Sequence, residues 1–289
     1  MSPARQVAEQ SALAAVAEVL SCPECDRGLS PAERALRCAR GHSFDIARQG
    51  YISLLTGAAG KLTGDSATML DARTAFQGAG YFSPIADAIA AAAGAGHDPG
   101  TGGIIADIGA GTGYYLARVL DAYPAVRGIG LDIAKSAGRR CARAHPRAAA
   151  VVADAWRGLP IRDHTLTAAL SVFAPRNPDA VSRVLAPGGR YIVVTPTVSH
   201  LAELIEPIGM VTVDPEKDRR LAEAMAGRFT RTEQRRIEYV MTLPHTDIAN
   251  LVAMGPSAHH ADATAERIAR LPEPFEVTAS VTVGTYLTT

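Results

Sequence analysis

Hydrophobic and polar positions divide the chain into a short N-terminal part and a longer part with repeated strand and helix patterns. The stretch SALAAVAEVL (11–20) has the spacing of a short amphipathic helix. Alternating apolar positions in SFDIARQGYISLL (43–55) predict the end of a small β-rich module, followed by the flexible segment GAAGKLTGDS (57–66). Residues 66–96 have a helical pattern with a break near 78–84, and the turn cluster GHDPGTGG (96–103) marks a domain boundary.

The part after this boundary alternates apolar runs with helical patterns. The apolar runs are IIADI (104–108), GIGLD (128–132), AAVVAD (149–154), TLTAALSVF (165–173) and YIVVTP (191–196). Alternating β and α units of this kind predict an α/β fold, a doubly wound sheet with helices on both faces.

Composition and charge limit the classes of function. The chain has 289 residues, with 29 basic and 29 acidic side chains, so a broad basic surface is excluded and any nucleic-acid contact must be local. No apolar run is long enough to cross a membrane, and no membrane partner is expected. Four cysteines, three of them clustered, are not a secreted disulfide framework, and we expect a cytoplasmic protein.

The clustered cysteines have the spacing of a metal site. Cys22-x2-Cys25-x12-Cys38-x3-His42 offers four sulfur and nitrogen ligands for one tetrahedral Zn²⁺. Four protein ligands leave no open position, so the zinc is expected to be structural, and its binding would help the short module to fold. The alternative is a pair of buried cysteines beside an unrelated histidine. Cys141 lies far away and is interpreted as a packed thiol.

A glycine-rich turn follows the first strand of the longer part. In IIADIGAGTGYY (104–115), Asp107 precedes three glycines at 109, 111 and 113. Such a turn lets a ligand approach the backbone and suits NAD, FAD or S-adenosylmethionine. The next two strands end in Asp132 and Asp154, and the first of these has the spacing of an acceptor for ribose hydroxyls.

Two details favour S-adenosylmethionine, namely the preceding Asp107 and the two tyrosines at 114 and 115 that follow the glycines. Together with the two acid-ended strands, this pattern resembles class I S-adenosylmethionine-dependent methyltransferases, which have a Rossmann-like sheet. The resemblance implies that Gly109, Gly111 and Gly113 wrap the amino-acid part of the cofactor. It also implies that Asp132 holds the ribose and that Asp154 faces the adenine. Without it, either acid alone could be a helix cap or a surface charge.

Further motifs narrow the resemblance to one family. They are CPxC…C…GHxFDxAxxGY (22–51), GDSAxMxxARxxFxxAG (64–80), DIGxGxGYY (107–115), AP (174–175), TPxxxHL (195–201) and MGPSA (254–258). Together they resemble the RlmA family of 23S rRNA guanine-N1 methyltransferases. MGPSA and the Ala/Arg-rich composition are most similar to its Gram-positive branch, which confers resistance to macrolides such as tylosin.

The family resemblance implies the domain order, the substrate and several site residues. The order is an N-terminal extension (1–21), a zinc-binding module (22–60), a helical linker (61–98) and a methyltransferase domain (99–289). The substrate is a guanine in a hairpin of 23S rRNA domain II, beside the peptide exit tunnel. The zinc ligands fall on the four residues of the cluster. Cofactor contacts fall on Phe82, Tyr115, Leu116 and His200. The family has a tyrosine at Phe82, so its hydrogen bond is either lost here or supplied by Tyr81.

The sequence does not identify the base that takes the proton from guanine N1. Asp65, His200 and a backbone carbonyl of SVFAP (171–175) are the candidates, and His200 has a packed or capping role as its alternative. Aromatic side chains at 81, 82 and 173 could stack on a base that leaves its helix, or could belong to the core. Arginines at 34, 37, 40 and 48 could contact phosphates, or form a solvated face.

Two other functions remain open at this stage. One is a methyltransferase for a small antibiotic precursor on the same scaffold, which the neutral net charge favours. The other is a zinc-dependent RNA-binding protein without catalysis, which the intact glycine turn and its two acids disfavour. The oligomeric state is open between monomer and homodimer.

Overall fold

The computed structural model describes residues 11–57, 64–94, 102–255 and 261–289. Some expectations from the sequence fall on the other residues and so lie outside the described part. These are the start of the N-terminal extension, residues 58–63 of the expected flexible segment, most of the 96–103 turn cluster and the end of the MGPSA motif.

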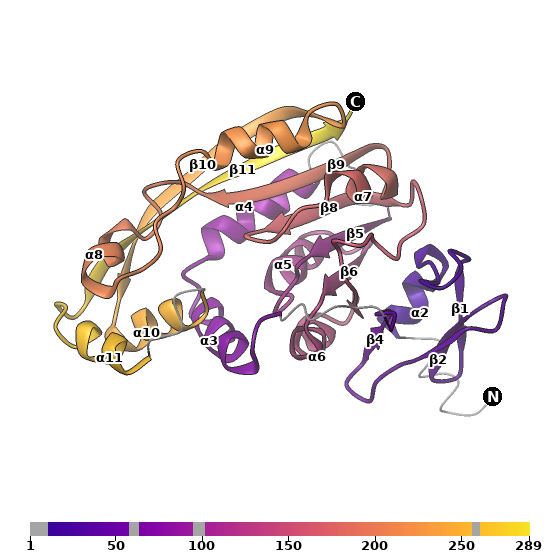
Figure 1. The fold of residues 1–289 in the computed structure, drawn as a ribbon, viewed down its shortest axis with the longest axis horizontal. Helices are drawn as coiled ribbons and strands as arrows, with labels where there is room; N and C mark the ends of the chain where they lie inside the picture. The colour runs from indigo at the N-terminus through magenta and orange to yellow at the C-terminus, as the bar shows by residue number, and fades with distance from the viewer. Residues whose placement is uncertain (1–10, 58–63, 95–101, 256–260) are drawn as a thin grey trace.

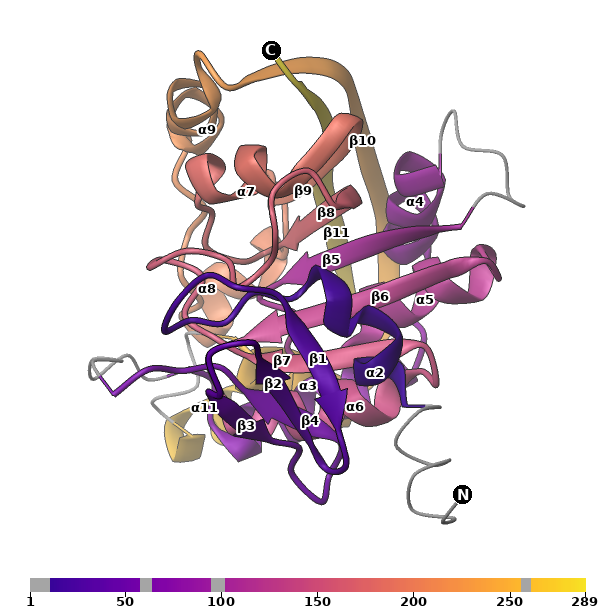
Figure 2. The same ribbon diagram turned by 90° about the vertical axis from the view of Figure 1, so that its right-hand side faces the viewer.

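The N-terminal part is a short helix followed by a small antiparallel sheet (Figure 2). Ser11 caps helix α2 (Ala12–Val16) by accepting a hydrogen bond from the N–H of Ala14 at 3.1 Å, which confirms the predicted helix. One turn of 3-10 helix, η1 (Ala17–Val19), follows. Strands β1 (Leu29–Ala32), β2 (Ala35–Cys38) and β3 (Ser43–Asp45) pair antiparallel in that order.

The longer part is built on an eight-stranded sheet in the order β10-β11-β9-β8-β5-β6-β7-β4. Its strands are β4 (Tyr51–Ser53), β5 (Gly103–Ile108), β6 (Val126–Asp132), β7 (Ala148–Val152), β8 (Leu166–Val172), β9 (Leu185–Pro196), β10 (Phe229–Leu243) and β11 (Phe275–Thr288). The strands from β9 to β4 are parallel, and the order reverses beside β5, so its carboxyl end is a ligand-binding edge. The antiparallel pair β10–β11 extends the sheet at the end opposite to β4 (Figure 1).

Helices cover both faces of this sheet, as the predicted doubly wound fold requires. On one face lie α3 (Ala67–Gly78), α4 (Ser83–Gly94), α5 (Tyr114–Ala122), α6 (Lys135–Ala144), η2 (Ala202–Leu204), α8 (Ile205–Ile208), α10 (His245–Ala253) and α11 (Ala261–Ile268). On the other lie α2, α7 (Pro178–Val184) and α9 (Lys217–Met225). Successive side chains of a strand point to opposite faces of the sheet, so alternate residues belong to one apolar cluster or the other. Each face therefore needs helices to cover it.

The small N-terminal sheet is fixed to the large sheet through β4. Ile52 of β4 is fully buried and lies opposite Val151 of β7 in a parallel pair. Leu20 also forms an isolated bridge with Ile161. Leu29 and Leu36 of the small sheet belong to the same apolar cluster as Val151. The two parts of the chain therefore share one core.

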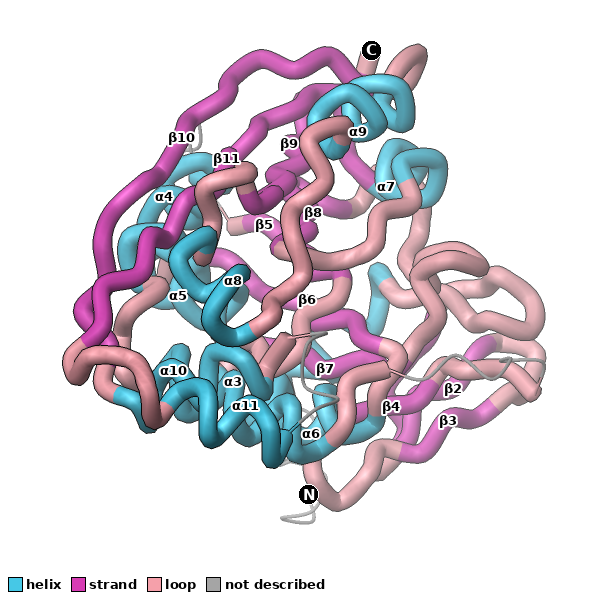
Figure 3. The backbone as a smooth tube through the Cα atoms, turned by 60° about the vertical axis from the view of Figure 1, so that its left-hand side comes forward, coloured by secondary structure: helices cyan, strands magenta, loops and turns pink. Residues whose placement is uncertain are grey.

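Two helices connect these parts in the sequence, and their boundaries match the predicted break. Ser66 caps α3 by accepting from the N–H of Met69 at 3.1 Å, and Gly80 at φ +85° lies in the turn before α4. Helix α3 packs against α10 and α6 (Figure 3), which places it over the edge where β5 ends. In the described part of the chain, no helix is both long and apolar enough to span a membrane.

Candidate functional site

Two tight turns bring the expected metal ligands together. The N–H of Asp26 donates to the carbonyl of Cys22 at 2.8 Å, and that of Gly41 donates to the carbonyl of Cys38 at 2.9 Å. Asp26 and Gly41 have φ of +57° and +88°, which asparagine-like residues and glycine adopt most readily. The β1–β2 hairpin lies between the two turns and sets their separation.

The four ligand atoms form a group of the size of a zinc site. The ligand atoms of Cys22, Cys25, Cys38 and His42 lie within 4.8 Å of one another. The Sγ atoms of Cys25 and Cys38 are 3.7 Å apart, and Nδ1 of His42 is 3.4 Å from Sγ of both Cys22 and Cys38. Tetrahedral zinc with bonds of about 2.0–2.3 Å separates its ligands by roughly 3.5–3.8 Å. The residues therefore fit Zn²⁺ and fill all four positions.

The glycine turn follows β5 and needs glycine at each of its three positions. Gly109, Gly111 and Gly113 have φ of +77°, +53° and +81°. A Cβ on Gly109 would lie 2.5 Å from Cβ of Ala174, so a side chain there would collide with the turn after β8. Glycine is thus required by the positive φ values and by the contact with the turn after β8, and a turn without side chains lets a ligand come close to its backbone.

Asp132 at the end of β6 holds this turn in place. Its Oδ2 accepts from the N–H of Gly111 at 2.9 Å, and its Oδ1 accepts from the N–H of Ala134 at 2.9 Å. Burial raises the pKa of the carboxyl group, and the two N–H donors oppose that shift. Each carboxylate oxygen has a further lone pair, so Asp132 can still accept from two ribose hydroxyls.

Asp107 at the end of β5 is a buried acid with a free oxygen. Its residue is 1% exposed, and within the described chain Oδ2 has no hydrogen-bond partner. Burial, together with the negative charge of Asp132, raises the pKa of this carboxyl to about 7. An unpartnered buried acid beside the glycine turn suits a positively charged ligand group.

Asp154 lies at the end of β7, beside a groove between the small sheet and the large one. Its Oδ1 accepts from the N–H of Trp156 at 3.0 Å, and Nε of Arg157 is 3.9 Å from Oδ2. The groove has a volume of about 760 Å³, and both Pro23 and Leu54 lie along it. Asp154 lines this groove, whereas the glycine turn does not, so the groove adjoins the turn site without containing it.

Three rings from distant segments meet beside the end of β8. Phe173 and His200 are stacked, with ring centroids 5.8 Å apart and planes 18° apart. Phe82 is buried, and its ring lies 6.4 Å from Phe173 and 6.3 Å from His200. Phe173 has φ +54° and is 41% exposed, so its ring is presented to solvent at a strained position.

His200 is held as a neutral ring. Its Nδ1 accepts a hydrogen bond from the N–H of Ser280 at 3.1 Å, which places the ring proton on Nε2. Burial, together with the charge of Lys217, lowers the pKa of His200 to about 4. In this state Nε2 donates a hydrogen bond, so the arrangement favours a donor role over the role of a base.

Tyr115 and Leu116, which are also expected to contact the cofactor, are buried residues of α5. Leu116 is fully buried and packs close to Gly128, and Tyr115 is 7% exposed in the same cluster. Tyr81 does not direct its hydroxyl toward the Phe82 ring, because that hydroxyl donates to Oδ2 of Asp247 at 2.8 Å. Of the two alternatives for the missing tyrosine at 82, the geometry therefore favours loss of the hydrogen bond.

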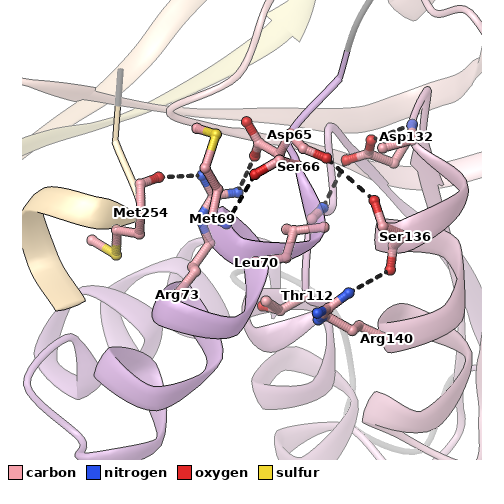
Figure 4. A network of polar contacts seen from close by, with 12 residues as sticks. Asp65, Ser66, Met69, Leu70, Arg73, Thr112, Asp132, Ser136, Arg140 and Met254 are labelled. Carbon is pink, nitrogen blue, oxygen red and sulfur yellow. Dashed lines mark hydrogen bonds and ion pairs between the residues drawn. The ribbon is translucent and has the colours of Figure 1, made fainter. Parts of the chain in front are cut away.

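The structure adds a network that the sequence analysis did not identify as a site, centred on Arg73 of α3 (Figure 4). Nη1 of Arg73 donates to Oδ2 of Asp65 at 2.6 Å, and Nη2 donates to the carbonyl of Met254 at 2.8 Å. The hydroxyl of Ser136 donates to the carbonyl of Asp65 at 3.2 Å. A nearby buried bond joins Thr112 of the turn to Gln77 of α3 at 2.6 Å. These partners are 8 to 181 residues apart, so local motifs could not reveal them.

These features together fit S-adenosylmethionine. The glycine turn offers an open backbone, Asp132 offers acceptors for the ribose, and Asp107 offers a buried negative charge for the cationic amino-acid end. Asp154 follows the next strand at the same sheet edge. The stacked rings of Phe173 and His200 lie at the end of β8, next to Ala174, which contacts Gly109 of the turn.

Comparisons with known proteins agree with this geometry. The family model for the RlmA N-terminal zinc ribbon matches residues 20–57, and a methyltransferase-domain model matches residues 105–189. The chain is 45% identical over 269 residues to the 23S rRNA (guanine(748)-N1)-methyltransferase of Streptomyces fradiae, covering 92% of this chain and 96% of that protein. It is 45% identical over 285 residues to a protein of Micromonospora griseorubida assigned as a 23S rRNA (guanine-N1)-methyltransferase, with the same coverage.

A more distant relative covers the same range. A Bacillus subtilis (strain 168) protein assigned to the same activity is 32% identical over 265 residues, which is 87% of this chain and 90% of that protein. The expected fold class, zinc-binding group and S-adenosylmethionine cofactor are thereby confirmed. The matches run through both the zinc ribbon and the catalytic sheet. The chain therefore belongs to the RlmA family of 23S rRNA (guanine-N1)-methyltransferases.

Proposed function

We propose that this protein transfers a methyl group from S-adenosylmethionine to N1 of one guanine in 23S rRNA. The target would be the base equivalent to guanine 748 in the name of the Streptomyces fradiae relative. The observation that carries the proposal is the joining of a zinc ribbon to the cofactor sheet, since β4 pairs with β7 and both parts share one core. A small-molecule methyltransferase has no need of this rigidly attached ribbon.

The acceptor base would enter beside Phe173. The cofactor supplies an activated methyl on its sulfonium, and the bond from carbon to sulfur breaks as the bond to guanine N1 forms. The protein has to align the two groups and exclude water. Phe173 is exposed at the end of β8, and His200 stacks on it, so a base turned out of its helix could extend this stack.

Guanine N1 must lose its proton during the transfer, and negative charge then builds up on O6. Nε2 of His200 could donate to that oxygen, since Nδ1 is occupied by Ser280. One oxygen of Asp65 is already engaged by the Arg73 guanidinium at 2.6 Å. Of the three candidates, these contacts favour a backbone carbonyl of the 171–175 turn, which would accept a hydrogen bond from N1–H while the proton passes to water.

RNA would be held by the zinc ribbon. Arg34, Arg37, Arg40 and Arg48 are exposed on its turns and strands, and none of the four has an ion pair within the described chain. The second basic stretch differs, because most of its cations are paired with acids. These pairs are Arg219 with Glu216 and Glu223, Arg220 with Asp214, Arg228 with Asp179, Arg231 with Asp218, and Arg236 with Glu238.

The proposal also covers the rRNA hairpin that holds the target, the cell compartment and the oligomeric state. We place the guanine in the domain II hairpin beside the exit tunnel, where its methylation would give resistance to tylosin-type macrolides. The enzyme would work in the cytoplasm, where ribosomal RNA is made. A homodimer remains our proposal for a state in which two zinc ribbons grip one hairpin.

A primer-extension assay on 23S rRNA tests the proposal, because a methyl on N1 blocks base pairing and stops the polymerase. Cells that lack this modification would carry the gene, the empty vector, or the Asp132→Ala variant. We expect a stop at one guanine of the hairpin with the gene only. Absence of a stop from rRNA, together with transfer of labelled methyl to small acceptors, would refute rRNA as the substrate.

A further inference from the structure

Arg73 is a cation placed directly over the glycine turn. A Cβ built on Gly111 would lie 3.0 Å from Nη1 of Arg73, whereas a Cβ on Gly109 or Gly113 would meet uncharged atoms first. The guanidinium group therefore lies beside Gly111, and Figure 4 shows its contacts to Asp65 and Met254. The Arg73 side chain is 24% exposed, so it is neither buried in the core nor free in solvent.

The hydrogen bonds of Arg73 leave part of its donor capacity unused. One N–H of Nη1 donates to Asp65, and one of Nη2 donates to the carbonyl of Met254. A guanidinium group has five N–H donors in a planar fork, so three remain for another acceptor. A carboxylate is the acceptor that such a fork matches best.

Three acidic side chains lie around the turn. Asp65, Asp107 and Asp132 all lie close to it, and burial raises the pKa of both Asp107 and Asp132. The amino-acid end of S-adenosylmethionine carries an ammonium group and a carboxylate. The three acidic side chains can attract the ammonium group of the cofactor. They would repel its carboxylate, which needs a cationic partner instead.

We propose that Arg73 binds the carboxylate of S-adenosylmethionine and so fixes the methionine end of the cofactor over Gly111. Asp65 and the carbonyl of Met254 hold the guanidinium in the orientation that this contact requires. This contact involves the cofactor and not the acceptor, so it can be tested separately from the proposal that rRNA is the substrate.

A calorimetric comparison of two ligands tests the proposal without any RNA. The ligands are S-adenosylmethionine and its decarboxylated analogue, which differ in the carboxylate alone. Removal of the carboxylate makes the analogue more positive, and the nearby acids should favour it, so a preference for S-adenosylmethionine must come from a contact to the carboxylate. We expect the wild-type protein to bind S-adenosylmethionine roughly ten- to a hundredfold more tightly.

The Arg73→Gln variant should bind the two ligands with affinities within about threefold of each other, through loss of affinity for S-adenosylmethionine. Arg140→Gln is the matched control. Arg140 of α6 also contacts α3, through Asp71 and the carbonyl of Ala67, but Arg73 and not Arg140 is the cation beside Gly111. This control should keep the wild-type preference.

Three results would overturn the proposal. The first is a wild-type protein that does not prefer S-adenosylmethionine, which needs no variant and so holds even if Arg73→Gln does not fold. The second is an Arg73→Gln variant whose affinities for both ligands equal those of wild type, which assigns the carboxylate to another residue. The third is an equal loss of affinity for both ligands, which makes Arg73 a structural tie between Asp65 and Met254.

Discussion

The N–H of Ser280 donates to Nδ1 of His200 at 3.1 Å, and this bond ties the histidine to the buried strand β11. The protonated ring would place a second proton on Nδ1, so the bond can form only with the neutral ring. Burial and the charge of Lys217 act in the same direction and lower the pKa of His200 from 6.5 to about 4. The acceptor side of the site is therefore built around an uncharged imidazole.

This histidine should make folding stability depend on pH. The unfolded chain protonates His200 near pH 6.5 and the folded chain only near 4, so stability should fall as pH drops through that interval. The loss due to His200 would be roughly 3 kcal/mol by linkage. In His200→Asn an amide oxygen can still accept from Ser280, but nothing titrates. Urea unfolding from pH 7.5 to 4 should show converging curves for the two proteins, and parallel curves would contradict the assignment.

Asp107 predicts a release of protons when the cofactor binds. Burial and the negative charge of Asp132 raise the pKa of this carboxyl to about 7, so it is partly protonated at neutral pH. A cationic ligand favours the ionised form and should displace the proton. Affinity for S-adenosylmethionine should therefore rise with pH below 7, by up to about tenfold per pH unit, and level off above it.

Calorimetry at pH 6.5 in buffers of different ionisation enthalpy measures this release directly. In Asp107→Asn the group cannot titrate, and both the proton release and the rise of affinity with pH should disappear. The apo form of wild type should also lose stability relative to this variant as pH rises from about 3.8 to about 7, and the difference should level off above 7, since the folded pKa lies above the unfolded value. Equal proton release in both proteins would exclude Asp107 as its source.

Asp132 is expected to contribute more to cofactor binding than a ribose contact alone. Replacing Asp132 by Ala removes the acceptor for ribose and also the bonds to the N–H groups of Gly111 and Ala134. S-adenosylmethionine affinity should fall about ten- to a hundredfold, or roughly 1.5–3 kcal/mol. Asp87→Ala, which removes an exposed acid paired with Arg118, is the control and should bind normally. A normal affinity in Asp132→Ala would rule out the ribose role.

Loss of a zinc ligand should remove the metal without a large change in cofactor affinity. Cys38→Ser should lower the zinc content from one per chain to near zero and loosen the β1–β3 sheet, so that RNA methylation falls. Cofactor affinity should change by less than about threefold, since Asp107 and Asp132 lie on other strands. The control is Cys141→Ala, which alters a buried thiol outside the cluster and should keep the metal. Retention of one zinc in Cys38→Ser would show that the ligand set is wrong.

Local patterns were sufficient for those features that depend on neighbouring residues. The cysteine spacing gave the metal cluster, because each pair of ligands lies within one tight turn. The positive φ of Gly109 and the acid at the end of β6 likewise follow from a single strand-turn-helix unit. Helices α3 and α4 and the break between them follow from the cap at Ser66 and the turn at Gly80.

Contacts over long sequence distances could not be predicted in this way. The pairing of Arg73 with Met254, and of Tyr81 with Asp247, depends on how α3 packs against α10. Strand β4 had a recognisable alternating pattern, but nothing in that pattern indicated that it would join β7 of the large sheet. Its partner is decided by the shared core, to which both ends of the chain contribute.

The arginines of the zinc ribbon should account for the salt dependence of RNA binding. Arg34, Arg37, Arg40 and Arg48 are exposed and lack an acidic partner in the described chain, so each can release a counterion when it contacts a phosphate. Replacing all four by Gln should weaken binding to the rRNA hairpin and flatten the slope of log affinity against log salt by roughly three units. S-adenosylmethionine affinity should not change.

A second quadruple variant separates this effect from a general loss of positive charge. Arg219, Arg220, Arg228 and Arg231 carry the same total charge but are paired with acids in the second basic stretch. Their replacement by Gln should leave the salt slope within about one unit of wild type, because paired cations release few counterions. If both variants flatten the slope equally, RNA binding follows net charge rather than the ribbon. If neither does, these arginines are a solvated face and the ribbon holds RNA by its shape.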